Sequence, residues 1–75
     1  MEESLEKRIS FKNGKAYIKG TNITVEKILE LLGEGKTFDD ILKMYPELER
    51  DDIKAALLFA KETIEELIDS GYIPA

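Results

Sequence analysis

The dipeptide Asn13-Gly14 constrains the fold of this chain most, because it lies between two short runs of alternating apolar and polar residues. Asn-Gly in that setting is the strongest short-range signal for a two-residue β-hairpin. We therefore predict a hairpin over residues 8–19. A two-stranded hairpin is marginal alone in water, so its apolar face must pack on helices or on another chain. The residues that this register places on the apolar face are Ile9, Phe11, Ala16 and Ile18.

The other face of the predicted hairpin is basic. Residues 7–24 hold five basic residues and no acid, whereas the whole chain has 11 Lys+Arg, 16 Asp+Glu and a net charge of −5. Two like-charged pairs, Arg8/Lys19 and Lys12/Lys15, face each other, which is unfavourable unless an anionic partner relieves it. Alternatively, the charges protect the strand edges from aggregation. The candidate residues for an anionic partner are Arg8, Lys12, Lys15, Tyr17 and Lys19.

Two shorter helices are predicted after the hairpin. Thr24 is suited to cap the N-terminus of a helix over about residues 25–34. Thr37 is suited to cap a second helix over about residues 38–44, and Asp40 stands at the capping-box position three residues later. Both helices carry apolar residues at helical spacing and so have one face for a core.

A third, longer helix is predicted over about residues 50–69. Glu49 or Arg50 begins it, Gly71 ends it, and about 19 residues span roughly 28 Å at 1.5 Å per residue. Phe59 widens an apolar stripe along one side. Because the helix is long for so small a body, we expect its far half to need something else to pack on. The stripe consists of Ile53, Ala56, Leu57, Ala60, Ile64, Leu67 and Ile68.

These elements predict a mainly α fold in one domain over residues 1–75. A three-helix, helix-turn-helix (homeodomain-like) bundle over residues 24–71 follows the N-terminal β-hairpin. The helix-turn-helix pair would be residues 38–44 and 50–69. The same plan also occurs in structural bundles, so it does not by itself indicate DNA binding.

The composition argues against an enzyme. The chain has no His and no Cys, which removes imidazole bases, thiol nucleophiles and the commonest metal ligands. The neighbouring carboxylates Asp39-Asp40 and Asp51-Asp52 point about 100° apart on a helix and do not converge. We therefore predict a binding protein without catalytic residues, cofactor or metal. No apolar run approaches 18 residues and no secretory signal is seen, so the expected location is the cytoplasm.

The order of motifs from about Arg8 to Ala60 resembles the small bacterial and archaeal domain-of-unknown-function family 433. The resemblance implies an antitoxin-like protein of VapBC-type toxin–antitoxin systems, with a helix-turn-helix after a β element and a PIN-like nuclease toxin as partner. The residues that carry the resemblance are Gly14-Lys15, Ile18-Lys19-Gly20-Thr21-Asn22-Ile23-Thr24-Val25, Ile28-Leu29, Gly35, Ile41-Leu42, Tyr45-Pro46, Leu48, Asp52-Ile53 and Ala55-Ala56-Leu57.

One departure from the family pattern falls in the turn Gly20-Thr21-Asn22, where the family usually has Gly-Thr-Arg. Asn22 cannot give the bidentate grip that a guanidinium offers to phosphate or carboxylate. Whatever role the family arginine has is therefore in doubt for this chain.

The leading hypothesis is an antitoxin-like binding protein that neutralises a PIN-like ribonuclease by contact, with operator DNA as an additional ligand. A PIN-type active site is acidic and holds a divalent metal, and the basic hairpin face is suited to reach it. Two alternatives are a DNA-binding transcriptional regulator without a toxin and a structural homo-oligomeric module.

The candidate DNA-binding residues are Arg50, Lys54 and Lys61, which lie on one side of the third helix. They are suited to touch phosphates, or they form a solvated flank whose stems cover apolar surface. Acidic residues at the start of the same helix count against DNA, because that end enters the major groove in a helix-turn-helix. Those acids are Glu47, Glu49, Asp51 and Asp52.

Leu58 lies off the apolar stripe, among charged residues of the third helix. Together with the apolar tail after Gly71, it suggests a helix-mediated interface for dimerisation or for a toxin. The candidate interface residues are Leu58, Tyr72 and Ile73.

Overall fold

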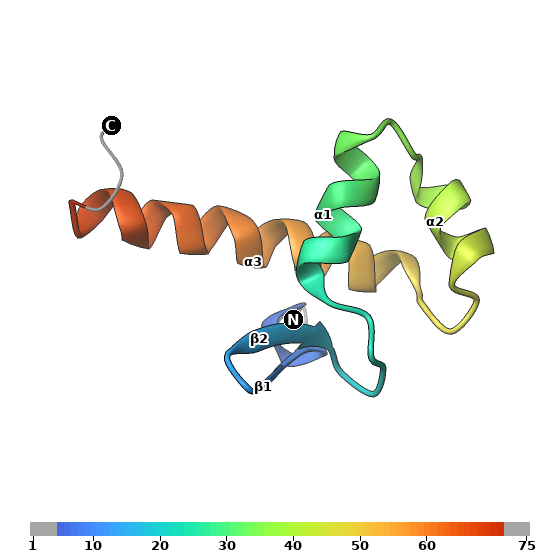
Figure 1. Ribbon diagram of the computed structural model, residues 1–75, viewed down its shortest axis with the longest axis horizontal. Helices are drawn as coiled ribbons and strands as arrows, with labels where there is room; N and C mark the ends of the chain where they lie inside the picture. Colours follow the sequence, from blue (N-terminus) through green and yellow to red (C-terminus); the bar gives the residue numbers. More distant parts are fainter. Residues whose placement is uncertain (1–4, 72–75) are drawn as a thin grey trace.

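The hairpin and two short helices gather at one end of a long third helix, as Figure 1 shows for the computed structural model. The structure describes residues 5–71. In chain order the elements are the 3-10 helix η1 (Leu5–Arg8), the strands β1 (Ile9–Lys12) and β2 (Lys15–Ile18), and the helices α1 (Val25–Gly33), α2 (Phe38–Met44) and α3 (Arg50–Asp69). The predicted mainly α fold, a hairpin followed by three helices, is confirmed.

The hairpin has the predicted register, with Ile9 opposite Ile18 and Lys12 opposite Lys15. Asn13 and Gly14 both take positive φ values, 52° and 78°, as the tight two-residue turn requires. The backbone N–H of Lys19 donates to the carbonyl of Arg8 at 2.7 Å, which extends the pairing by one residue. The local sequence signal therefore determined the hairpin completely.

The N-termini of α1 and α2 are capped by the predicted threonines. Thr24 Oγ1 accepts from the backbone N–H of Lys27 at 3.0 Å. Thr37 Oγ1 accepts from the N–H of Asp40 at 3.1 Å, and Asp40 Oδ2 accepts from the N–H of Thr37 at 2.9 Å. These bonds satisfy backbone donors that have no partner inside the helix.

The core is built around four isoleucines, each contributed by a different element. Ile18 of β2, Ile28 of α1, Ile41 of α2 and Ile53 of α3 are at most 1% exposed. Smaller residues of α3, Ala55 and Ala56, let the shorter helices approach it closely. The complete set of buried apolar residues is Ile9, Ile18, Ile23, Val25, Ile28, Leu31, Ile41, Leu48, Ile53, Ala55 and Ala56.

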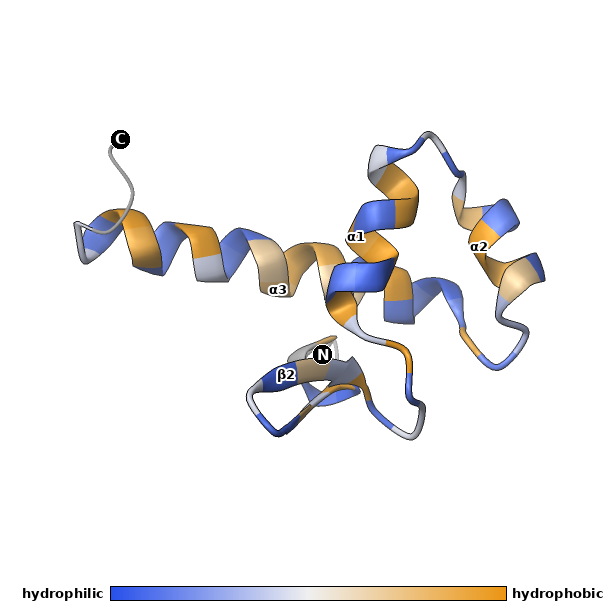
Figure 2. Cartoon of the chain, viewed as in Figure 1, coloured by the Kyte–Doolittle hydropathy of each residue, from blue (hydrophilic) through white to orange (hydrophobic). Residues whose placement is uncertain are grey.

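The helix α3 divides into an anchored half, residues 50–56, and a projecting half, residues 57–69. The projecting half extends beyond α1 and α2 (Figure 1), and its apolar residues appear as separate bands between hydrophilic ones (Figure 2). Leu57 is 39% exposed and Ile64 is 49% exposed. The anchored half is thus part of the core and the projecting half is not, in agreement with the expectation that the far half of this helix needs something else to pack on.

Two features of α3 explain this difference. Its buried face is centred on Asp52 and Ala56 and includes Ala55, so the helix is rotated away from the predicted stripe. The helices α1 and α2 have 9 and 7 residues, against 20 in α3, so they are too short to cover it.

No helix in residues 5–71 combines the length and the apolar character needed to cross a membrane.

Candidate binding surfaces

The polar side of the hairpin carries three exposed lysines, Lys12, Lys15 and Lys19, which we call the lysine face. Lys12 Nζ lies 4.9 Å from the centroid of the Tyr17 ring, a cation–π distance that orients Lys12 along the hairpin. Among the side chains that the structure describes, which do not include Glu6, none of the three lysines forms an ion pair with a carboxylate. The lysine face therefore offers uncompensated positive charge on an ordered backbone.

Arg8, which the sequence grouped with these lysines, lies in a different environment. Its Nη1 is 3.0 Å from Asp52 Oδ1 and 3.1 Å from Glu49 Oε1, and its Nη2 is 3.7 Å from Asp51 Oδ2. Hydrogen bonds to Asp52 and Glu49 raise the pKa of Arg8 above its usual value. The prediction that Arg8 offers its charge to an external anion is wrong, because η1 packs on α3 and places the guanidinium beside that helix's own acids.

The acids at the start of α3 have structural partners. Asp52 is only 7% exposed; its Oδ2 accepts from the backbone N–H of Glu49 at 2.8 Å, and its Oδ1 accepts from Arg8. Asp52 thus completes a capping box with Glu49 and also balances Arg8. These roles account for acids that would repel DNA phosphates at this helix end.

The three candidate DNA-binding residues are all exposed, and each lies beside a carboxylate of the chain. An intramolecular acid reduces the charge that each offers to a phosphate. The pairs are Arg50 with Asp39, Lys54 with Asp51 at 4.0 Å and Lys61 with Glu65 at 3.2 Å. The structure brings these three residues to one side of α3 but not into an uncompensated basic patch.

The turn Gly20-Thr21-Asn22 is held by Thr21. Its hydroxyl donates to the carbonyl of Ile18 at 2.8 Å and accepts from the backbone N–H of Ile23 at 3.0 Å. Gly20 takes a φ of +83°, which L side chains rarely adopt. The side chain of Asn22 is exposed at the edge of a shallow hollow and contributes nothing to this bonding. Gly20 and Thr21 therefore shape the link between β2 and α1.

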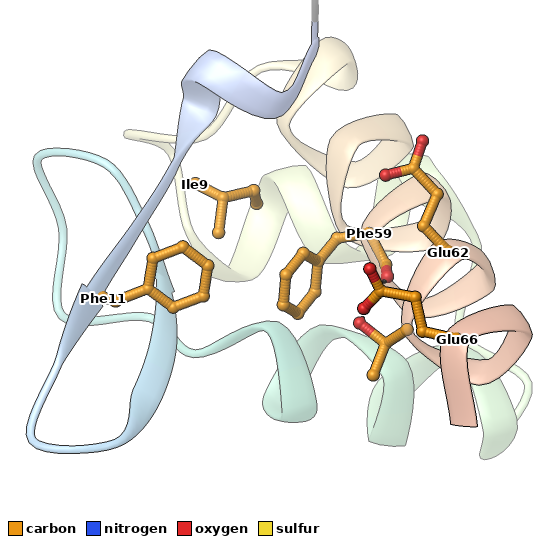
Figure 3. A pocket seen from close by; sticks show the side chains of 6 residues that line it. Ile9, Phe11, Phe59, Glu62 and Glu66 are labelled. Carbon is orange, nitrogen blue, oxygen red and sulfur yellow. Dashed lines mark hydrogen bonds between the residues drawn. The ribbon is translucent and has the colours of Figure 1, made fainter. Parts of the chain in front are cut away.

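An aromatic groove lies between the hairpin and α3. Phe11 is 67% exposed, and its ring centroid is 5.6 Å from that of Phe59 at an interplanar angle of 54°. Hollows of about 330 Å³ and 500 Å³ lie on the two sides of this pair. Figure 3 shows the smaller hollow, with Phe11 pointing from β1 toward Phe59 and with Glu62 and Glu66 on the α3 side. Sequence analysis missed this groove because it placed Phe11 under cover.

Leu58 is 43% exposed on the projecting half of α3. The other two interface candidates, Tyr72 and Ile73, lie outside the described residues.

Within the described residues no group of three or more acidic side chains is placed to hold a metal ion.

A family model described as "Protein of unknown function (DUF433)" matches residues 8–60, most of the chain. The chain belongs to the DUF433 family. No curated protein and no solved structure matches it.

The match places the hairpin, α1, α2 and the first eleven residues of α3 within the DUF433 domain. It contains the lysine face, the turn at Gly20 and the pairing of Arg8 with α3. It stops at Ala60, within the projecting half. Because the family description gives no function, the function of this DUF433 protein must be inferred from its surfaces.

Proposed function

We propose that this DUF433 protein is an antitoxin-like binding protein that neutralises a PIN-like ribonuclease by direct contact, without catalysis of its own. The observation that carries this proposal is the lysine face, because Lys12, Lys15 and Lys19 are exposed and have no carboxylate partner among the side chains that the structure describes. The proposed site of action is the cytoplasm, where such a ribonuclease meets its RNA.

The chemistry of a PIN-type active site suits these lysines. By family resemblance that site is a cluster of carboxylates that holds a divalent metal, so it presents negative charge in a cleft. Lys12 and Lys15 face each other directly, and an anionic partner relieves the repulsion between them. Complementary charge also raises the association rate and makes it fall with added salt.

The aromatic groove gives the same partner an apolar contact. Phe11 lies on the opposite face of the hairpin from the lysines, yet Lys15 and Phe11 both line the larger hollow. Protein interfaces commonly combine an aromatic centre with a charged rim. The hairpin tip therefore provides both kinds of contact within one ordered element.

A DNA-binding regulator without a toxin is a weaker proposal. Arg50, Lys54 and Lys61 each lie beside a carboxylate, and Asp51 and Asp52 stand at the helix end that would enter the groove. This alternative, like operator binding by an antitoxin, predicts mobility shifts with promoter-upstream DNA that weaken steeply with salt. A purely structural homo-oligomer gives the lysine face no role.

The decisive experiment co-expresses the protein with a PIN-like nuclease encoded next to its gene. We expect one complex on size exclusion and loss of ribonuclease activity. Lys15→Glu combined with Lys19→Glu should weaken the complex by about tenfold or more, because each substitution reverses a charge at the contact. Lys36→Glu combined with Lys43→Glu changes the net charge equally on exposed positions elsewhere and should leave the complex intact. Absence of a complex with wild type would overturn the proposal.

A further inference from the structure

The projecting half of α3 carries an apolar seam that the chain itself does not cover. Leu57, Ala60, Ile64 and Leu67 recur at intervals of three, four and three residues, the spacing of the a and d positions of a coiled coil. Leu57 and Ile64 are 39% and 49% exposed, and Ala60 and Leu67 are half-buried. Figure 2 shows apolar bands on the part of α3 that extends from the body.

We propose that this seam pairs with the same seam of a second copy of the chain, with the two α3 helices antiparallel about a two-fold axis near residue 62. In this register Ala60 of each copy lies opposite Ile64 of the other, and Leu57 lies opposite Leu67. Large side chains thus face small ones at the centre and leucines meet at both ends. A two-fold axis makes the seam complementary to itself, as a symmetric dimer requires.

The hollow beside the seam favours this occupant. Ala60 lines the larger hollow, of about 500 Å³, together with Val25 and Leu29 of α1. Ile64 of the second copy, opposite Ala60, is placed to enter this hollow, and the symmetry repeats the contact in the other copy. The partner helix therefore meets an apolar wall that α1 already provides.

Charge on the flank of the seam fits the same register. Lys61 of both copies meets near the axis, and each is paired at 3.2 Å with Glu65 one turn further on. Around the axis, the positive charges of Lys61 therefore alternate with the negative charges of Glu65. Lys54 faces Ile68 of the second copy, where its aliphatic stem can cover that half-buried side chain. No uncompensated like charges meet in this arrangement.

In a parallel pair, the flank that carries Lys54, Lys61 and Ile68 would lie against the other flank of the partner's seam. On that other flank, Phe59 packs against Phe11, and Thr63 lines both hollows beside the hairpin. A second helix on the seam lies beside the hairpin in either orientation, so crosslinking decides between the two. Lys15 and Phe11 also line the larger hollow that Ile64 of the second copy enters, so the dimer and the proposed nuclease contact share that hollow. Because sedimentation uses the chain without the nuclease, its result does not depend on the proposed function.

Sedimentation equilibrium on the full chain, from micromolar to millimolar concentration, tests the seam. We expect a reversible dimer for wild type. Ile64→Glu should raise the dimer Kd by about 100-fold or more, because it replaces two buried apolar contacts per dimer with charges. Met44→Glu is the matched control, since Met44 of α2 is 49% exposed, as Ile64 is, but lies outside the seam. Circular dichroism verifies that both variants remain folded.

Disulfide trapping tests the orientation, because the chain has no cysteine and each introduced thiol is the only one. Lys61→Cys should oxidise to a covalent dimer, since the two thiols meet near the axis. Lys54→Cys and Ile68→Cys should each remain single chains, but a mixture of the two should form the crosslinked heterodimer. In a parallel dimer, positions 61 and 68 of one copy would face the other flank of the partner's seam, so neither the single variants nor the mixture would crosslink.

Four results would overturn the inference. They are a monomeric wild type at millimolar concentration, a dimer that Ile64→Glu leaves intact, failure of Lys61→Cys to crosslink, and failure of the mixed pair to crosslink. A monomer whose nuclease complex is lost on Ile64→Glu would assign the seam to the nuclease instead of to a second copy.

Discussion

The two halves of α3 carry similar apolar residues and have opposite surroundings. In the anchored half, Ile53, Ala55 and Ala56 are at most 1% exposed. In the projecting half, Leu57 and Ile64 are 39% and 49% exposed, although they belong to the same apolar stripe. Helical periodicity therefore indicates that a helix has an apolar face, but it does not indicate what covers that face or how far the cover extends.

The difference follows from the lengths of the neighbouring elements. A 20-residue helix spans about 30 Å at 1.5 Å per residue. The strands have four residues each and the shorter helices nine and seven, so they can shelter only one end of it. The anchored half accordingly holds the fold together, and the projecting half is a surface.

Truncating isoleucine once in each half should show the largest contrast. Ile53→Ala should cost about 2–5 kcal/mol of unfolding free energy, because Ile53 is fully buried and its loss leaves a cavity. Ile64→Ala should cost about 0.5 kcal/mol or less in the monomer, as for other exposed positions. Urea unfolding at low micromolar concentration measures both values without a contribution from association.

A domain of this size has a small stability reserve, so Ile53→Ala can unfold outright. Ile53→Val, which removes one methyl group and should cost about 0.5–1.5 kcal/mol, keeps the comparison measurable. Equal losses at positions 53 and 64 would contradict the division of α3 into two halves.

The first turn of α3 should show the next largest effect. Asp52→Ala removes a capping-box carboxylate and the principal partner of Arg8, and should cost about 1–2 kcal/mol. Asp51→Ala is the matched control, because Asp51 is half exposed and its oxygen lies 3.7 Å from Arg8. That exposed pair should contribute about 0.5 kcal/mol or less. Thermal melts at equal protein concentration would test the ranking, which a larger loss at Asp51 would reverse.

Local signals in the sequence predicted the hairpin and the caps because short-range bonds determine them. The turn at Asn13-Gly14 fixes its register by backbone geometry alone, and Thr24 and Thr37 each bond within the next helical turn. The surroundings of Arg8 could not be predicted in this way. Arg8 meets Asp52, 44 residues later in the chain, only because η1 packs on α3.

The exposure of Phe11 and Ile64 also depends on tertiary packing. The hairpin face was expected to be sheltered, and Ile9 and Ile18 are, but Phe11 lies at the tip, beyond the main core. For Ile64, the three–four–three spacing was visible in the sequence and predicted an apolar face. The sequence did not show how α3 is rotated about its own axis. In the structure the side of α3 with Asp52 and Ala56 faces the core, and this rotation decides which side of the apolar face is covered.

A smaller effect than these substitutions is expected from acid, which should lower the free energy of unfolding through Asp40 of α2, at the end of the molecule that holds the anchored half. Hydrogen bonds from the backbone N–H and the side chain of Thr37 lower the pKa of Asp40 below its ordinary value of 3.8. A carboxylate whose pKa is lower in the folded than in the unfolded chain stabilises the fold above the unfolded pKa. That stabilisation is lost as the pH falls from near 3.8 through the lower folded value.

Asp40→Asn should be less stable than wild type at neutral pH, and the difference should shrink between about pH 5 and pH 2. Urea unfolding midpoints of both proteins, measured across this pH range, would show the shrinking difference. If the two plots of midpoint against pH stay parallel, Asp40 does not contribute to the loss of stability in acid.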